Sequence, residues 1–144
     1  MSLGYWLLSM FLVLFLMIAD MNHRGAYQAT QAADSANQQR ARQTVHYINT
    51  INDYLYANPQ NRGVISEAKL GFASVPSLAH VIEKGRVFVY QPNQPGLMRA
   101  LRAQTRDSAL LGRVHQRRLV DNRGDELNIT LPNVIPDTAL VYLN

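Results

Sequence analysis

Leu3-Gly-Tyr-Trp-Leu-Leu-Ser-Met-Phe-Leu-Val-Leu-Phe-Leu-Met-Ile-Ala19 is the stretch that decides how this chain is organised. It contains no charged residue, whereas all 14 Lys and Arg and all 10 Asp and Glu residues lie between positions 20 and 144. At about 1.5 Å per residue, this run forms a helix of roughly 26 Å, close to the roughly 30 Å hydrocarbon core of a bilayer. Because the run is apolar on every face, it predicts a membrane span.

Tyr5 and Trp6 lie near one end of this run, where amphipathic rings favour the headgroup level. A cleaved signal peptide has basic residues before its apolar core and a small-x-small cleavage sequence after it. Here only the α-amine is basic before the run, and Ile18-Ala19-Asp20-Met21 is a poor cleavage sequence. We expect a retained anchor, with a cleaved signal peptide and a buried soluble helix as the alternatives. The predicted anchor residues are Tyr5, Trp6, Leu7, Leu8, Phe11, Leu12, Leu14, Phe15, Leu16 and Ile18.

The charges that flank the anchor give only a small indication of its orientation. Asp20, His23 and Arg24 follow the run, and only the α-amine precedes it. By the positive-inside rule this arrangement leans slightly towards a cytoplasmic C-terminal part, although long downstream domains translocate largely regardless of charge.

Residues 20–57 are predicted to continue the helix. This stretch has no proline, is rich in Ala, Gln and Arg, and contains Gly25 as its sole glycine. In its second half, apolar residues recur at three- and four-residue spacing, which makes one apolar face. Asn58-Pro59 ends the pattern. The alternative is a break between residues 22 and 25, which would separate an anchor from a second helix.

The remaining residues predict a small α+β domain with a mostly antiparallel sheet. Together with the helix, the pattern gives three parts: a membrane anchor at 1–19, a helical stalk and domain helix at 20–57, and an α+β domain at 58–144. The elements expected in the last part are short helices at 76–83 and 97–111, and strands at 85–91, 113–120, 126–131 and 139–143, with a hairpin turn at 121–125.

The sequence indicates no catalytic, cofactor-binding or metal-ligating residues. Cysteine is absent, which excludes thiolate metal sites, disulfides and cysteine nucleophiles. The four histidines, His23, His46, His80 and His115, do not share the three- or four-residue spacing of helical metal ligands. No glycine-rich phosphate loop or nucleophile elbow is present. We therefore expect no enzyme activity, no cofactor and no small-molecule substrate.

One segment concentrates positive charge. Residues 97–123 contain seven Arg and two Asp, a net charge of 7 − 2 = +5, against +4 for the whole chain. Nucleic-acid binding is not indicated, because the segment has no Phe, Tyr or Trp for base stacking. A solvated surface, an acidic protein partner and anionic lipid stay open as interpretations. The candidate docking residues are Arg99, Arg102, Arg106, Arg113, Arg117 and Arg118.

Several of these features together resemble the small PilM-type proteins of conjugative-plasmid thin pilus (type IVb pilus) systems. They are the chain length, the Tyr5-Trp6-Leu7-Leu8 start, the Ala- and Gln-rich helix, Gly63-Val64-Ile65-Ser66, Leu70-Gly71-Phe72, and Ile135-Pro136-Asp137 leading to Val141-Tyr142.

The resemblance implies a non-enzymatic, single-pass protein of the bacterial inner membrane, whose soluble domain is periplasmic and contacts other pilus assembly proteins. Two alternatives remain. One is a pilin-like or minor pilin subunit, with Gly4-Tyr5 as a cleavage point, although Ser9 stands where pilins carry Glu. The other is an unrelated membrane-tethered module that binds proteins.

Overall fold

The structure, a computed structural model, describes residues 2–73 and 75–144. The described residues form the helices α1 (Ser2–Ala57), α2 (Glu67–Leu70) and α3 (Leu97–Gln104) and a six-stranded sheet, which confirms the α+β class. The chain divides into two compact units, Met1–Ala36 and Asn37–Asn144, and the boundary lies within α1.

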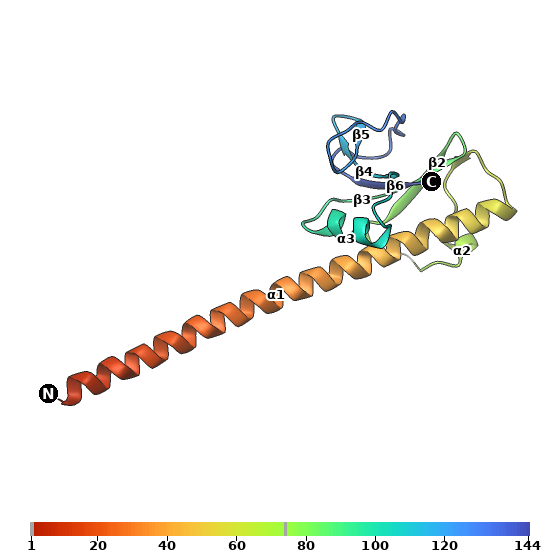
Figure 1. Cartoon of the computed structure of the whole chain (residues 1–144). Coiled ribbons are helices and arrows are strands. Elements are labelled where there is room, and N and C mark those ends of the chain that lie inside the picture. Colours follow the sequence, from red (N-terminus) through yellow and green to blue (C-terminus); the bar gives the residue numbers. More distant parts are fainter. Residues whose placement is uncertain (1, 74) are drawn as a thin grey trace. The chain divides into compact units, whose positions relative to one another are not determined.

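Helix α1 is continuous from Ser2 to Ala57 and passes through Gly25 without a break (Figure 1). The expected continuous helix is therefore confirmed. In the first unit, none of the described residues 2–36 is buried. Near the other end, the Asn58 N–H still donates to the Tyr54 carbonyl at 2.9 Å, and Pro59 then stops the helix.

The sheet has the strand order β1-β2-β3-β6-β4-β5, and every neighbouring pair is antiparallel. The C-terminal strand is central, because it pairs with β3 on one side and β4 on the other. The strands are β1 (Arg62–Gly63), β2 (Ala79–Glu83), β3 (Arg86–Gln91), β4 (Leu111–His115), β5 (Arg118–Val120) and β6 (Leu140–Leu143).

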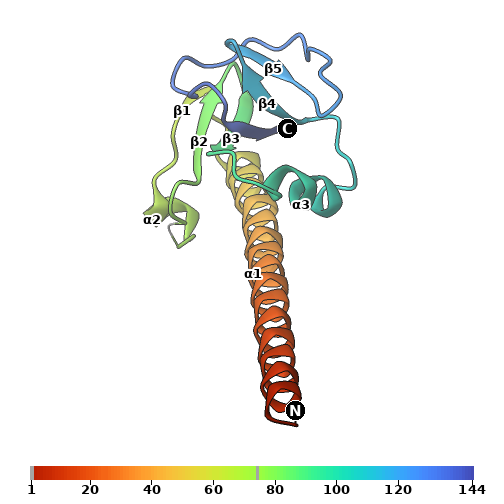
Figure 2. The same cartoon turned by 90° about the vertical axis from the view of Figure 1, so that its left-hand side faces the viewer.

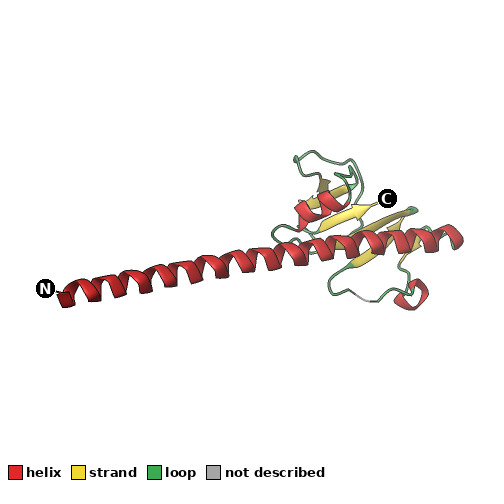
Figure 3. Cartoon of the chain, turned by 60° about the horizontal axis from the view of Figure 1, so that its bottom comes forward, coloured by secondary structure: helices red, strands yellow, loops and turns green. Residues whose placement is uncertain are grey.

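Each face of the sheet buries its own apolar layer. Residues 37–57 of α1 and the helix α3 cover one face (Figures 2 and 3), where Ile48, Ile51 and Leu101 pack on the strands. The segment 127–139 covers the other face, where Leu131 and Ile135 meet Phe88. Successive strand residues alternate between these layers, as the period of a strand requires.

A buried polar chain fixes α1 against β3. The Gln91 side chain accepts from Arg40 Nε at 2.6 Å and donates to Thr44 Oγ1 at 2.9 Å. Asn37 Nδ2 donates to the Pro95 carbonyl at 2.9 Å. Gly96 has φ +83°, and a Cβ there would lie 2.8 Å from Asn37 Nδ2, so this position requires glycine. Burial lowers the pKa of Arg40.

A second polar connection centres on His80, which is buried in β2. Its Nε2 accepts from the Ile65 N–H at 3.0 Å, and its Nδ1 lies 2.6 Å from Tyr47 Oη. Because Nε2 is an acceptor, the neutral ring is assigned its proton on Nδ1, which donates to Tyr47. Burial lowers the pKa of His80. Burial, with smaller effects of Glu67 and Tyr90, raises the pKa of Tyr47 to about 12.

Three of the elements expected between residues 76 and 120 differ from the structure. The helix predicted at 76–83 is wrong: β2 occupies Ala79–Glu83 and pairs with β3 through a tight turn at Lys84 and Gly85. The helix predicted at 97–111 ends at Gln104, because Leu111 is needed in β4 beside β6. The single strand predicted at 113–120 is two strands, separated by Gln116 and Arg117 with φ of 49° and 64°.

The strand expected after the turn at 121–125 also differs from the structure. The strand expected at 126–131 is reduced to an isolated bridge between Val120 and Glu126. The strands predicted at 85–91 and 139–143 are confirmed as β3 and β6. The sequence did not predict β1 or α2, which are only two and four residues long.

We expect the lowered pKa of His80 to make the fold sensitive to mild acid. The unfolded chain protonates this histidine at its ordinary pKa of about 6.5, whereas the folded chain resists, because protonated Nε2 would face the Ile65 N–H. The free energy of unfolding therefore falls as the pH drops below about 6.5, and above that pH this group has no effect.

Denaturant unfolding of the detergent-solubilised chain between about pH 7 and pH 5 measures this effect. A His80→Asn variant should lose less stability over this interval than the parent. A His115→Asn variant, changed at an exposed position, should lose as much as the parent. Equal slopes for the parent and His80→Asn would contradict the assignment.

Candidate partner-docking surface

Helix α3 presents the first of the candidate arginines. Leu97 and Leu101 are buried against Ala41 of α1 and against Leu111 and Leu140 of the sheet. This packing leaves Arg99 exposed and Arg102 half-buried on the outer side of α3. Arg106 follows the helix, in a turn where it has φ 54° and Asp107 has φ 56°. The helix expected at 97–111 would place Arg106 on one face with Arg99 and Arg102, but α3 ends at Gln104 and Arg106 lies outside it.

Two of the candidate arginines are engaged in exposed ion pairs. Arg102 Nε lies 3.0 Å from Asp107 Oδ1, and Arg118 Nη1 lies 2.9 Å from Glu126 Oε2. Such surface pairs contribute about 0–1 kcal/mol each to the free energy of unfolding. Both guanidinium groups are therefore engaged within the chain.

Arg117 has a structural role. Its Nη1 donates to the Ile135 carbonyl and its Nη2 to the Pro132 carbonyl at 3.2 Å. These bonds connect the β4–β5 turn to the segment that covers the second sheet face. Both terminal nitrogens of Arg117 are therefore engaged within the chain.

Arg99, Arg106 and Arg113 are exposed and form no ion pair with any described residue. Arg113 lies on β4, opposite Leu140 and Val120 in the register, and so on the sheet face that α3 covers. We call these three residues the free arginine set. Exposed guanidinium groups bind carboxylates or phosphates in bidentate geometry, and this set comprises those of the six candidate arginines that form no bond to another described side chain or carbonyl.

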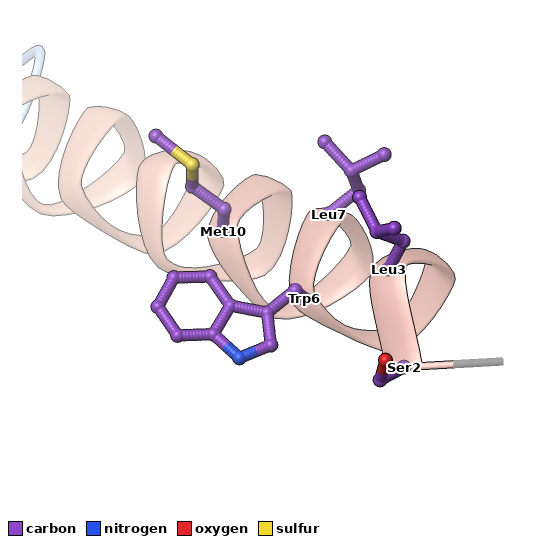
Figure 4. A pocket seen from close by; sticks show the side chains of 5 residues that line it. All are labelled: Ser2, Leu3, Trp6, Leu7 and Met10. Carbon is purple, nitrogen blue, oxygen red and sulfur yellow. The ribbon is translucent and has the colours of Figure 1, made fainter.

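The described residues offer little chemistry beyond charge. No group of three or more His, Cys, Asp or Glu side chains among them could hold a metal ion. A hollow of about 380 Å³ is lined by Ser2, Leu3, Trp6, Leu7 and Met10. Figure 4 shows that all five side chains come from one helix. This hollow is a groove on an apolar helix, suited to lipid contact.

Helix α1 also contains the one candidate membrane span found in the described residues. Its apolar window has a mean hydropathy of 2.1 and is 0% buried within the structure. The predicted anchor residues lie in this part of α1, and their side chains are exposed, Trp6 to 77%. An apolar helix with no protein to cover it is suited to a bilayer.

Comparison with known proteins identifies the family. The sequence model of the PilM family matches residues 10–143. The chain belongs to the PilM family. This match confirms the family resemblance seen in the sequence. It also supports the expectation that the protein is pilus-related.

Two crystal structures of proteins described as PilM are similar to this chain. The one from Escherichia coli B7A has 42% identity and a TM-score of 0.66, and the match covers 76% of this chain and 92% of that one. The one from Pseudomonas aeruginosa 2192 has 28% identity and a TM-score of 0.45, with 72% and 90% covered. No match among curated proteins is found.

We expect Arg117 and the free arginine set to behave differently on truncation. Arg117→Ala should lower the free energy of unfolding by about 1–2 kcal/mol, because two carbonyl oxygens lose charged donors. Arg99→Ala and Arg113→Ala, the matched controls, should stay within about 0.5 kcal/mol of the parent. Denaturant midpoints measure all three variants. An Arg117→Ala variant as stable as the controls would contradict the structural role of Arg117.

Proposed function

We propose that this PilM-family chain is a non-enzymatic, membrane-anchored structural component of a type IVb pilus assembly or pilin transport apparatus. The observation that carries the proposal is a family match over residues 10–143 in a chain whose α1 begins with an uncovered apolar span. The location we propose is the bacterial inner membrane, with the soluble domain in the periplasm.

The mechanism we propose is positional. The anchor holds the chain in the bilayer, and the domain of residues 58–144, with the end of α1, binds other pilus assembly proteins. The free arginine set supplies the contact, since three unpaired guanidinium groups attract an acidic protein face. No step in this mechanism requires a small-molecule substrate or a cofactor.

We expect the first 19 residues to remain on the mature protein and to hold it in the membrane. The reason is the uncharged run of residues 3–19, which is long enough to span a bilayer, and the poor cleavage sequence Ile18-Ala19-Asp20-Met21 at its end. Intact-mass measurement of membrane-extracted protein should give the uncleaved chain. Protease added to spheroplasts should digest the domain and leave a cytoplasmic control protein intact.

Other results of the mass measurement and the protease experiment would favour the alternatives. A mature species beginning near Gly25 would indicate a cleaved signal peptide. A species beginning at Tyr5 would favour the pilin-like alternative. A domain that is protected in intact spheroplasts and digested only after lysis would place it in the cytoplasm.

The docking proposal predicts separate effects on assembly and on folding. Changing Arg99, Arg106 and Arg113 together to Glu should abolish pilus production while thermal unfolding stays close to that of the parent. A buried interface arginine costs about 2 kcal/mol or more on truncation, roughly a 30-fold loss of affinity. The matched control changes the exposed cations Arg42, Arg62 and Lys69 to Glu, the same change in charge, and should produce pili.

Pilus counts by electron microscopy and a thermal melt of each variant decide the question. Normal pili from the folded docking variant would mean that these arginines are merely solvated. If that variant melts early, the corresponding Gln substitutions remove the charge without adding repulsion, and pilus counts are then read from them.

A further inference from the structure

The segment that follows β5 has the pattern of a strand but lacks a neighbour. After the Val120–Glu126 bridge, the Leu127 N–H donates to the Leu119 carbonyl at 2.8 Å, and strand pairing then stops. The side chains of Leu127, Ile129 and Leu131 still pack on the apolar layer, while Asn128 and Thr130 are exposed. This alternation with a period of two shows an extended segment.

The backbone of residues 128–131 is unpaired. Within the part of the chain that the structure describes, none of their N–H or C=O groups forms a hydrogen bond with another protein group. Because backbone groups alternate sides along an extended chain, those of Asn128 and Thr130 point away from the side on which Leu127 bonds to Leu119. They form a short free edge, which is a template for another strand.

A cleft of about 270 Å³ lies between this edge and the β2–β3 hairpin. It is lined by Glu83, Lys84, Arg86, Phe88, Asn128, Ile129 and Thr130. Lys84 and Arg86 are exposed and form no ion pair with a described residue, while Glu83 is half-buried. Phe88 is buried at 2% exposure and forms an apolar wall. The tight turn, with φ 51° at Lys84 and 75° at Gly85, fixes both cations at the hairpin end.

We propose that this cleft binds an extended, acidic segment of another protein. The segment adds as a strand to the free edge at residues 128–130. One of its carboxylates reaches Lys84 and Arg86, and an apolar side chain packs against Phe88 and Ile129. Strand addition combines backbone hydrogen bonds for affinity with side-chain pockets for specificity.

Other occupants fit the cleft less well. A helical partner could not pair with the free edge at residues 128–130, because its backbone N–H and C=O groups already bond to one another within the helix. A second copy of this chain, added by a two-fold antiparallel pairing, would bring the Lys84 and Arg86 of both copies together, and like charges repel. This inference does not rest on the pilus assignment or on the free arginine set.

The test begins with a photo-crosslinking amino acid at Thr130 of the full chain, expressed in cells that make the native machinery. Asn122, exposed in the neighbouring turn, is the matched control position. The crosslinked segment is mapped by mass spectrometry, and we expect it to contain Asp or Glu. A blocked synthetic peptide of that segment, and a version N-methylated at alternate residues, are then titrated against the detergent-solubilised full chain.

We expect the peptide to slow hydrogen exchange of the Asn128 and Thr130 amides by about tenfold, and the N-methylated peptide to have no effect. Changing Lys84 and Arg86 together to Glu should weaken binding of the peptide about tenfold. The control variant, with the exposed residues Arg42 and Arg123 changed to Glu, should weaken binding less than about twofold. If the first pair lowers the melting temperature, Gln at both positions replaces Glu.

Four results would overturn the proposal. They are the absence of a crosslink specific to Thr130, a crosslink to a second copy of this chain, a segment without an acidic residue, and binding that survives N-methylation of the peptide.

Discussion

The packing of residues 41–51 of α1 on the central strands is the interaction on which the rest of the second unit depends. Ala41 and Ile51 are 0% exposed and Ile48 is 2% exposed. Truncation of a buried isoleucine costs about 2–5 kcal/mol, a large share of the stability of a domain of this size. The bonds of Gln91 and His80 lie at the same contact. They fix where along α1 the strands rest, because a displaced helix would leave these buried polar groups unpaired.

Helix α1 is stabilised by different forces along its length. Residues 37–57 are held by tertiary packing, which supplies most helical stability in proteins. Residues 2–36 bury nothing within the chain. In the apolar part, a bilayer would stabilise the helix, because hydrocarbon offers no alternative partner for the backbone. Between them, the helix depends on intrinsic propensity and on side-chain pairs such as Arg24–Asp20 and Gln31–Tyr27.

The sequence could predict what depends on local pattern. The long helix, the proline that ends it, and the strands β3 and β6 follow from propensity and periodicity. It could not predict β2, because Pro76 is a local helix-start signal while the pairing of Val81 and Ile82 with β3 is a tertiary interaction. Nor could it find the end of α3: Arg106 and Asp107 adopt positive φ so that Leu111 can reach β6. The sequence shows that arginines are concentrated at 97–123. It does not show that Arg117 donates to backbone carbonyls or that Arg118 pairs with Glu126, because these partners are distant in the sequence.

The sheet separates the two proposed binding regions. Arg113 lies opposite Leu140 in the register, so it shares the face that α1 and α3 cover. Phe88 and Ile129 belong to the apolar layer of the opposite face. A partner on the free arginine set and a strand in the cleft would therefore meet different sides of the same sheet, and neither would need to displace the other. We propose that this chain is structural and not catalytic. Two independent binding faces would let it hold two partner proteins at the membrane at the same time.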